Sequence, residues 1–218
     1  MRDAYHDQLD ELVDGLTGMC DQVREALARA TRGMLEVDLQ LVEQVITDDD
    51  RIDELRDDAE DAAVRILNSQ ASVAADLRIV VAATYCAREL ERMGDLAVHI
   101  ARDARRRHPR PVLPTEVAPY FADMGRIGCA LASKTSEVIR TRDPVKAVEL
   151  DSDDDAMDEL HQHVFSVLEN PNWRHGVKAA VDITLLARFY ERYADHAVTV
   201  ARRVVYVVTG RMPGPLAV

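Results

Sequence analysis

The sequence contains an internal duplication, which constrains the fold more than any other feature. The segment from Arg88 to Arg102 returns one hundred residues later as the segment from Arg188 to Arg202. The residue types that both copies keep are largely polar, and they are Arg, Glu, Arg and Asp on one side of a helix. A duplicated core alone would not require these residue types. We therefore expect chemistry or recognition at this repeated segment.

Helical periodicity divides each half of the chain into three segments separated by turn-type residues. The predicted helices cover residues 5–33, 38–68, 72–107, 115–140, 143–169 and 175–209. No segment has the alternating pattern of a strand, and the chain has only nine glycines and eight prolines to interrupt a helix. A helix of about 30 residues is about 45 Å long. The sequence therefore predicts an all-α fold of two tandem, pseudo-symmetric antiparallel three-helix bundles.

Domain boundaries follow from the same periodicity. Residues 1–108 are expected to form the first three-helix repeat and residues 115–210 the second. The segment 109–114 between them holds three prolines, too many for a continuing helix, so it is interpreted as a connector. The segment 211–218 is interpreted as a loose C-terminal tail.

Charge argues against nucleic acid as a partner. The 218 residues carry a net charge of −12, whereas phosphate-backbone binding depends on neutralising phosphates with Lys and Arg. One basic run, Arg105 to Arg110, closes a predicted helix, where cations complement the negative end of the helix dipole. We interpret that run as a helix terminus and not as a binding patch.

Hydropathy argues against direct insertion into a membrane. No stretch approaches the roughly 20 apolar residues that a membrane span needs. The first residues are charged and lack the apolar core of a secretory signal. We therefore expect a cytoplasmic protein.

Carboxylates recur at helical spacing in both halves. Glu91 and Asp95 lie four residues apart, as Glu191 and Asp195 do, so each pair shares one face of a helix. A second acidic pattern on the middle helix of each half contributes Asp49 with Asp53, and Asp154 with Asp158. If the middle and last helices of a bundle are neighbours, each half gathers four carboxylates. Such oxygen donors suit Mg²⁺, Mn²⁺ or iron.

A plainer interpretation competes with the metal site. Arg88 and Arg92 flank Glu91, and the second copy has the matching arginines, so the carboxylates can belong to surface ion networks. Acidic residues near a helix start are also favoured by the dipole and solvated. The repetition of the same residue order in two copies favours a metal or partner surface. Small residues beside Glu91, such as Gly94, are expected to leave room for a ligand.

Catalytic chemistry has no candidate residues in this sequence. His99 and His196 adjoin the motifs, but neither has a counterpart in the other copy, so both are interpreted as bystanders. The paired Glu-x-x-His pattern of a di-iron bundle does not occur, the nearest approach being Asp158 and His161. Neither a glycine-rich phosphate loop nor a Ser/His/Asp arrangement is found. We expect a protein that is not an enzyme.

Taken together, these motifs closely resemble those of the PhoU family of phosphate-signalling regulators. Members carry an acidic motif on the last helix of each half, within a run similar to L-E-R-I-G-D-x-A-x-N-I-A. Leu90 to Ala101 matches this run closely, and Tyr190 to Ala201 matches it less fully. Asp76 to Arg78 is similar to the family's D-L-R segment, and Asp49 to Leu55 to its acidic middle-helix signature. The resemblance spans nearly the whole chain.

This resemblance implies a non-enzymatic role. Family members inhibit the phosphate-starvation two-component system when phosphate is plentiful, linking the sensor histidine kinase to the ATPase of the phosphate ABC transporter. These partners would recruit a cytoplasmic protein to the inner face of the membrane. We also expect a homodimer, because an exposed helical face can serve self-association.

The resemblance also implies metal ligands. Carried over residue by residue, they are Glu91, Asp95, Glu191 and Asp195, with Asp49, Asp53, Asp154 and Asp158 as additional candidates. Iron, zinc, manganese and magnesium are the candidate ions. His99 and Thr199 stand where the family run has Asn, and Ala194 where it has Gly, so the rim of the site differs from the family pattern. A metal-storage bundle and a plain helical scaffold remain the alternative functions.

Overall fold

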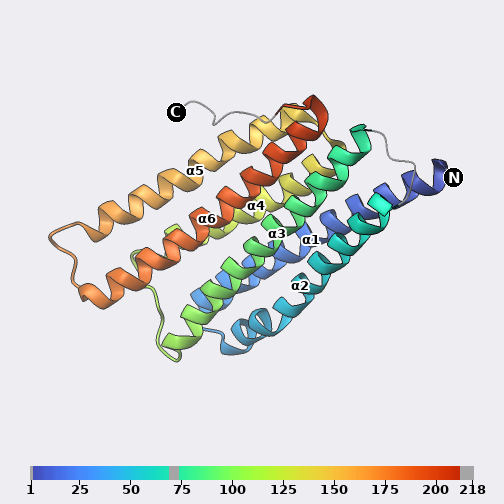
Figure 1. The fold of residues 1–218 in the computed structure, drawn as a ribbon. Helices are drawn as coiled ribbons and strands as arrows, with labels where there is room; N and C mark the ends of the chain where they lie inside the picture. The colour runs from blue at the N-terminus through green and yellow to red at the C-terminus, as the bar shows by residue number, and fades with distance from the viewer. Residues whose placement is uncertain (1, 69–73, 212–218) are drawn as a thin grey trace.

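The computed structural model describes residues 2–68 and 74–211 and is built from six long helices (Figure 1). They are α1 (Arg2–Glu36), α2 (Leu39–Asn68), α3 (Ala74–Arg107), α4 (Ala118–Thr141), α5 (Pro144–Leu168) and α6 (Gly176–Thr209). Strands do not occur in the described residues, and the predicted all-α class with two three-helix halves is confirmed. Most of the predicted tail, residues 212–218, and most of the predicted turn after residue 68 lie outside the described residues.

Local sequence chemistry sets several helix ends. The Asp143 carboxylate accepts a hydrogen bond from the backbone N–H of Val145 at 2.8 Å, and Pro144 occupies the first helical position of α5. At the other end of the chain, Gly210 closes α6 with φ of 71°, a conformation that glycine adopts without strain. The predicted start of one helix at residue 143 and the predicted end of another at residue 209 agree with these caps, because capping chemistry is local.

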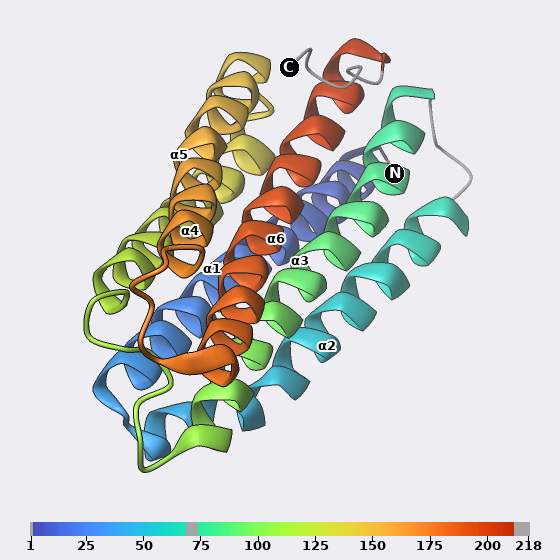
Figure 2. The ribbon, with the colours of Figure 1, turned by 90° about the vertical axis from the view of Figure 1, so that its left-hand side faces the viewer.

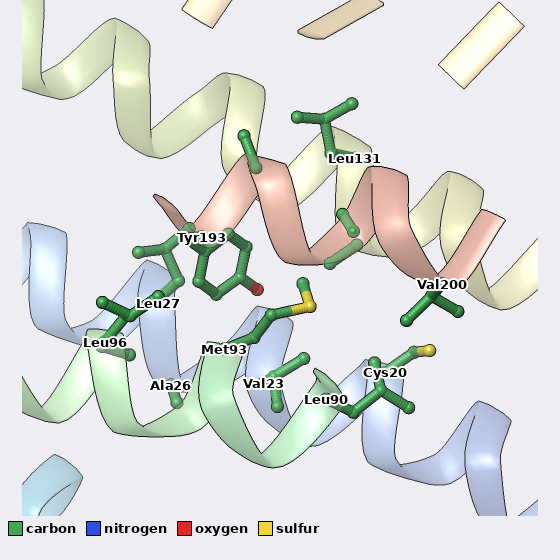
Figure 3. Packing of buried hydrophobic residues seen from close by; sticks show 14 of the residues in the cluster. Cys20, Val23, Ala26, Leu27, Leu90, Met93, Leu96, Leu131, Tyr193 and Val200 are labelled. Carbon is green, nitrogen blue, oxygen red and sulfur yellow. The ribbon is translucent and has the colours of Figure 1, made fainter. Parts of the chain in front are cut away.

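The helices pack in two layers. In one layer α2, α3, α6 and α5 lie side by side, and in the other α1 and α4 cover the back of α3 and α6 (Figures 1 and 2). The halves meet where α1 packs on α4 and α3 on α6. Buried side chains of both halves form one continuous hydrophobic cluster, in which Tyr193 of the second half packs with Leu27 and Met93 of the first (Figure 3). The two halves therefore share one continuous core.

The connector between the halves is longer than predicted and is packed against the core. α4 begins at Ala118 and not at residue 115, because the backbone N–H of Val117 first closes a turn onto the carbonyl of Pro114 at 3.1 Å. Val112, Leu113 and Val117 are buried. The proline-rich segment is thus a folded part of the molecule.

The basic run at the end of α3 does more than complement a helix dipole. Arg106 and Arg107 both pair with Asp182 of α6, with Arg106 Nη2 at 3.1 Å and Arg107 Nε at 2.7 Å from the carboxylate oxygens. The Asp182 side chain is only 7% exposed. A carboxylate this buried requires such partners. The run thus lies in the last turn of α3, as predicted, and it also ties the two halves together.

A close helix approach supports the contact between the halves. Gly125 of α4 faces Thr31 of α1, and a Cβ at Gly125 would lie 2.6 Å from Thr31 Cγ2. The Thr31 hydroxyl shares a 2.8 Å hydrogen bond with the Tyr190 hydroxyl of α6, and both groups are buried. Glycine is therefore required here by space. In contrast, a Cβ at Gly18 of α1 would meet nothing within 4 Å.

These two glycines give a matched test of the packing. Gly125→Ala should lower the free energy of unfolding by about 1–3 kcal/mol, because the added methyl displaces Thr31 in a packed core. Gly18→Ala should raise it by about 0.5–1 kcal/mol, because alanine is the better helix former. Urea unfolding followed by circular dichroism measures both. Equal stabilities for the two variants would contradict the packing described here.

Candidate functional site

The first-half carboxylates gather where α2 packs on α3. Asp49 lies near Asp95, Asp53 and Glu91, and burial together with these like charges raises the pKa of Asp49 to about 6. Burial first, and then Asp95, also raises the pKa of Glu91, whose side chain is only 13% exposed. The structure therefore brings together the four carboxylates that the sequence placed on two helices.

The second half repeats this cluster where α5 packs on α6. Burial raises the pKa of Asp154 to about 7, and Asp158, Asp195 and Glu191 contribute to the rise. Burial and the Asp195 charge raise the pKa values of Asp158 and Glu191 as well. Crowded carboxylates of this kind are short of positive charge.

The two clusters differ in the cations that neutralise them. In the first half Arg56 Nη1 lies 3.6 Å from Glu91 Oε1 and 4.0 Å from Asp53. Arg92 lies 3.6 Å from Glu91 Oε2 and 2.7 Å from Asp95. Both oxygens of Glu91 therefore face a guanidinium group. Arg92 belongs to the ion network that the plainer interpretation of the sequence described, whereas Arg88 pairs with Glu60 at 2.9 Å and Arg56 takes its place beside Glu91.

The second cluster lacks a counterpart of Arg56. When Asp49 is aligned with Asp154, the position of Arg56 is taken by His161. Arg188 pairs with Glu191 Oε1, but Glu191 Oε2 is buried without a hydrogen-bond partner, and so is His161 Nε2. Burial and the nearby Arg188 lower the pKa of His161, which favours the neutral imidazole. The second half thus retains an oxygen and a nitrogen donor without partners.

The donor chemistry suits a metal ion, but the side chains are not arranged as a formed site. Carboxylate oxygens suit hard cations, and a neutral imidazole nitrogen widens the choice to zinc or iron. Within residues 2–68 and 74–211, however, no group of three or more His, Cys, Asp or Glu side chains is placed to hold a metal ion. The ligand assignments from the sequence remain predictions.

The small residue beside Glu91 serves packing and leaves no room for a ligand. A Cβ at Gly94 would lie 2.9 Å from Ile52 Cδ1, so the glycine allows α2 to approach α3 closely. Its counterpart Ala194 is fully buried. The space expected at this position is filled by the neighbouring helix.

Both histidines beside the motifs lie in the contact between α3 and α6. His99 stacks on Phe189 with ring centroids 5.2 Å apart, and His196 Nδ1 lies 2.6 Å from Glu89 Oε2. They therefore join the two halves. Sequence reasoning missed this role because a pairing between residues about 100 positions apart has no local signal.

None of the helices in the described part of the chain is both long and apolar enough to cross a membrane.

Comparison with known proteins gives one consistent result. A family model described as the PhoU domain matches residues 16–104 and 121–204, once in each half. The chain is 53% identical to a protein of Mycobacterium leprae named phosphate-specific transport system accessory protein PhoU homolog 1, over 98% of this chain and 96% of the relative. It is 52% identical to the corresponding homolog 2 of Mycobacterium tuberculosis, over 98% of this chain and the whole relative.

Solved structures share the fold. The phosphate transport system regulatory protein PhoU from Streptococcus pneumoniae superposes with a TM-score of 0.87 at 21% identity, covering 97% of this chain and 100% of that structure. PhoU from Pseudomonas aeruginosa gives a TM-score of 0.82 at 24% identity, covering 95% and 100%. At these identities the likeness establishes the architecture of six helices.

The raised pKa of Asp154 predicts a pH-dependent stability. Between its ordinary value of 3.8 and about 7, the folded protein binds a proton that the unfolded chain has released. The proton bound by Asp154 therefore stabilises the fold fully below the ordinary pKa of the carboxyl group. This stabilisation is lost as pH rises through the folded-state pKa. Asp154→Asn should be more stable than the wild type at about pH 8, with the difference closing toward pH 4. Urea unfolding with a chelator present measures this.

Glu159→Gln is the matched control, because Glu159 is exposed on the same helix. It should follow the wild-type pH dependence. If Asp154→Asn also follows the wild type at every pH, that result would contradict the claim that neighbouring carboxylates and burial raise the pKa of Asp154.

Proposed function

The chain belongs to the PhoU family, and from this membership we propose that it is a non-enzymatic regulator of phosphate uptake and phosphate-starvation signalling. In this role it links the ATPase of the phosphate ABC transporter to the sensor histidine kinase and keeps the two-component pathway inactive when phosphate is plentiful. Its place is the cytoplasm, at the inner face of the membrane where these partners reside.

The match of both halves to the PhoU domain carries this proposal, together with relatives more than half identical that are named accessory proteins of phosphate-specific transport. The thiols support a role without covalent catalysis. Burial raises the pKa of Cys86 to about 12 and that of Cys129 to about 11, and it raises that of Cys20 further. A nucleophilic cysteine needs the opposite shift.

Deleting the gene tests the signalling role. We expect a phosphate-responsive promoter to become active at high phosphate in the deletion strain, because the link that inactivates the kinase is lost. A reporter fusion measures this, and a plasmid copy of the wild-type gene should restore repression. Unchanged repression in the deletion strain would count decisively against the proposal.

We propose metal binding as a second function, confined to the second half. The buried Oε2 of Glu191 and the buried Nε2 of His161, which both lack a hydrogen-bond partner, favour it. Glu191, Asp195, Asp154 and Asp158 would hold the ion, with His161 as a further donor. The bound cation would supply the positive charge that Arg56 supplies in the first half.

Exchanging the residue that distinguishes the halves tests this. His161→Arg should weaken metal binding at least about tenfold, because it removes a donor and introduces a competing cation. Glu91→Ala and Asp95→Ala should leave metal affinity unchanged, whereas Glu191→Ala and Asp195→Ala should reduce it. Titration calorimetry with Zn²⁺ and with Mn²⁺, and metal analysis of the purified proteins, measure the effect. Equal metal affinity in all variants would remove the ligand assignment.

A further inference from the structure

The outer edge of the second half holds a cluster of carboxylates that the chain's own cations neutralise only in part. α5 and α6 lie side by side there (Figure 1), and four carboxylates meet between them, those of Glu191, Asp195, Asp154 and Asp158. Arg188 pairs with Glu191 Oε1, and within the described residues the three aspartates form no ion pair. Crowded carboxylates with one cation among them attract another.

The first half shows which group completes the same cluster. Arg56 of α2 lies with Nη1 3.6 Å from Glu91 Oε1 and 4.0 Å from Asp53 Oδ1. Its Nε and Nη2 donate hydrogen bonds to Asp57 Oδ1 at 3.1 and 2.8 Å. One guanidinium group thus spans carboxylates from two helices, α2 and α3, as its planar fork of donors allows.

The second half repeats the acceptors of this arrangement without the donor. Glu191 and Asp158 repeat two of the three carboxylates, and the amide of Gln162 stands in place of the third. His161 stands at the donor position. Glu191 Oε2 and His161 Nε2 are both buried without a hydrogen-bond partner. A buried acceptor without a partner is costly, so this arrangement favours a donor from outside the chain.

The cluster lies where a side chain from another protein can reach it. Asp158 and Asp195 are exposed and form its rim. The Glu191 side chain is 13% exposed, which is the same fraction as for Glu91. Glu91 contacts a guanidinium group at this exposure, so the equivalent position beside Glu191 is within reach of a guanidinium group from solvent.

The spread of these side chains suits a guanidinium group better than a metal ion. A metal ion such as Ca²⁺ or Mg²⁺ needs several oxygen atoms about 2.0–2.6 Å from one point. In the part of the chain that the structure describes, no three His, Cys, Asp or Glu side chains are placed in this way. A guanidinium group instead offers five N–H donors and contacts separate carboxylates, whereas a lysine ammonium is a compact point charge. Metal binding would draw the side chains together first, and arginine binding would not.

We propose that the second-half cluster docks an arginine side chain of a partner protein, in the place that Arg56 takes in the first half. The guanidinium group contacts Glu191 Oε2 and the carboxylate of Asp158. An arginine docked there and a metal ion exclude each other, because both need the Glu191 carboxylate. This exclusion rests on the metal binding proposed above, whereas the docking of arginine stands without it.

A short peptide tests the docking. The probe is N-acetyl-Gly-Arg-Gly-amide, added to the full chain with a chelator present, and an NMR chemical-shift titration measures its affinity. His161→Arg should weaken binding at least about tenfold, because the new side chain fills the cluster as Arg56 does. Glu159→Gln is the matched control, because it raises the net charge by the same amount at an exposed position on the same helix. This variant should bind the peptide like the wild type.

The first half supplies the converse test. Arg56→Ala removes the guanidinium group from Glu91 and should therefore create a second site for the peptide, which doubles the binding stoichiometry. Glu91→Gln in the otherwise wild-type chain should leave peptide binding unchanged, because the first cluster is already filled. Thermal melting checks that each variant folds. Unchanged stoichiometry in a folded Arg56→Ala variant would count against the first half as the template for the second.

The remaining outcomes separate the docking of arginine from its alternatives. Equal loss in His161→Arg and Glu159→Gln would show attraction by net charge alone, and equal binding of the citrulline or lysine peptide would remove the preference for a guanidinium group. Either result, or no binding to the wild type, overturns the proposal. If His161→Arg abolishes self-association in light scattering, a second copy supplies the arginine and a separate partner is overturned.

The metal proposal is judged separately. Titration with Zn²⁺ in the absence of peptide tests metal binding, and the peptide titration with chelator tests docking, so either can fail alone. If both bind, saturating Zn²⁺ should weaken peptide binding at least about tenfold, because the ion takes the Glu191 carboxylate. Peptide affinity that is the same with and without Zn²⁺ would overturn the exclusion.

Discussion

The antiparallel contact of α3 with α6 is the constraint on which the rest of the structure depends. It is held at one end by the carboxylate of Asp182, which is buried and therefore depends on the guanidinium groups of Arg106 and Arg107 from the other half. His99 and His196 add cross-contacts nearer the middle. This register sets where each repeated motif lies. It leaves the two acidic clusters at the outer edges of the pair, where α2 packs on α3 and α5 packs on α6.

Duplication preserved the backbone and let the electrostatics of the two halves diverge. In the first half Arg56 acts as an internal cation and satisfies Glu91, so the cluster is nearly complete without a ligand. In the second half His161 stands at that position, and Glu191 Oε2 is buried without a hydrogen-bond partner. One substitution on the middle helix thus separates a closed ion network from an open one. Two repeats with the same fold need not share a function.

Local features of this fold could be predicted from the sequence, and contacts between distant segments could not. The cap at Asp143 depends on neighbouring residues, and the convergence of Asp49 on Glu91 follows from helical spacing once α2 and α3 are neighbours. The sequence could not show that Gly94 receives Ile52, since that close approach depends on how two helices cross. The pairing of Asp182 with the basic run was hidden for the same reason.

The buried connector has a mechanical consequence. Because Val112, Leu113 and Val117 are packed into the same core that spans both halves, the described part of the junction offers no free hinge about which one bundle could swing against the other. Any opening between the bundles would expose apolar side chains of that shared core to water, which is unfavourable. The two bundles therefore keep one fixed arrangement, and any partner would meet the molecule as a single rigid body.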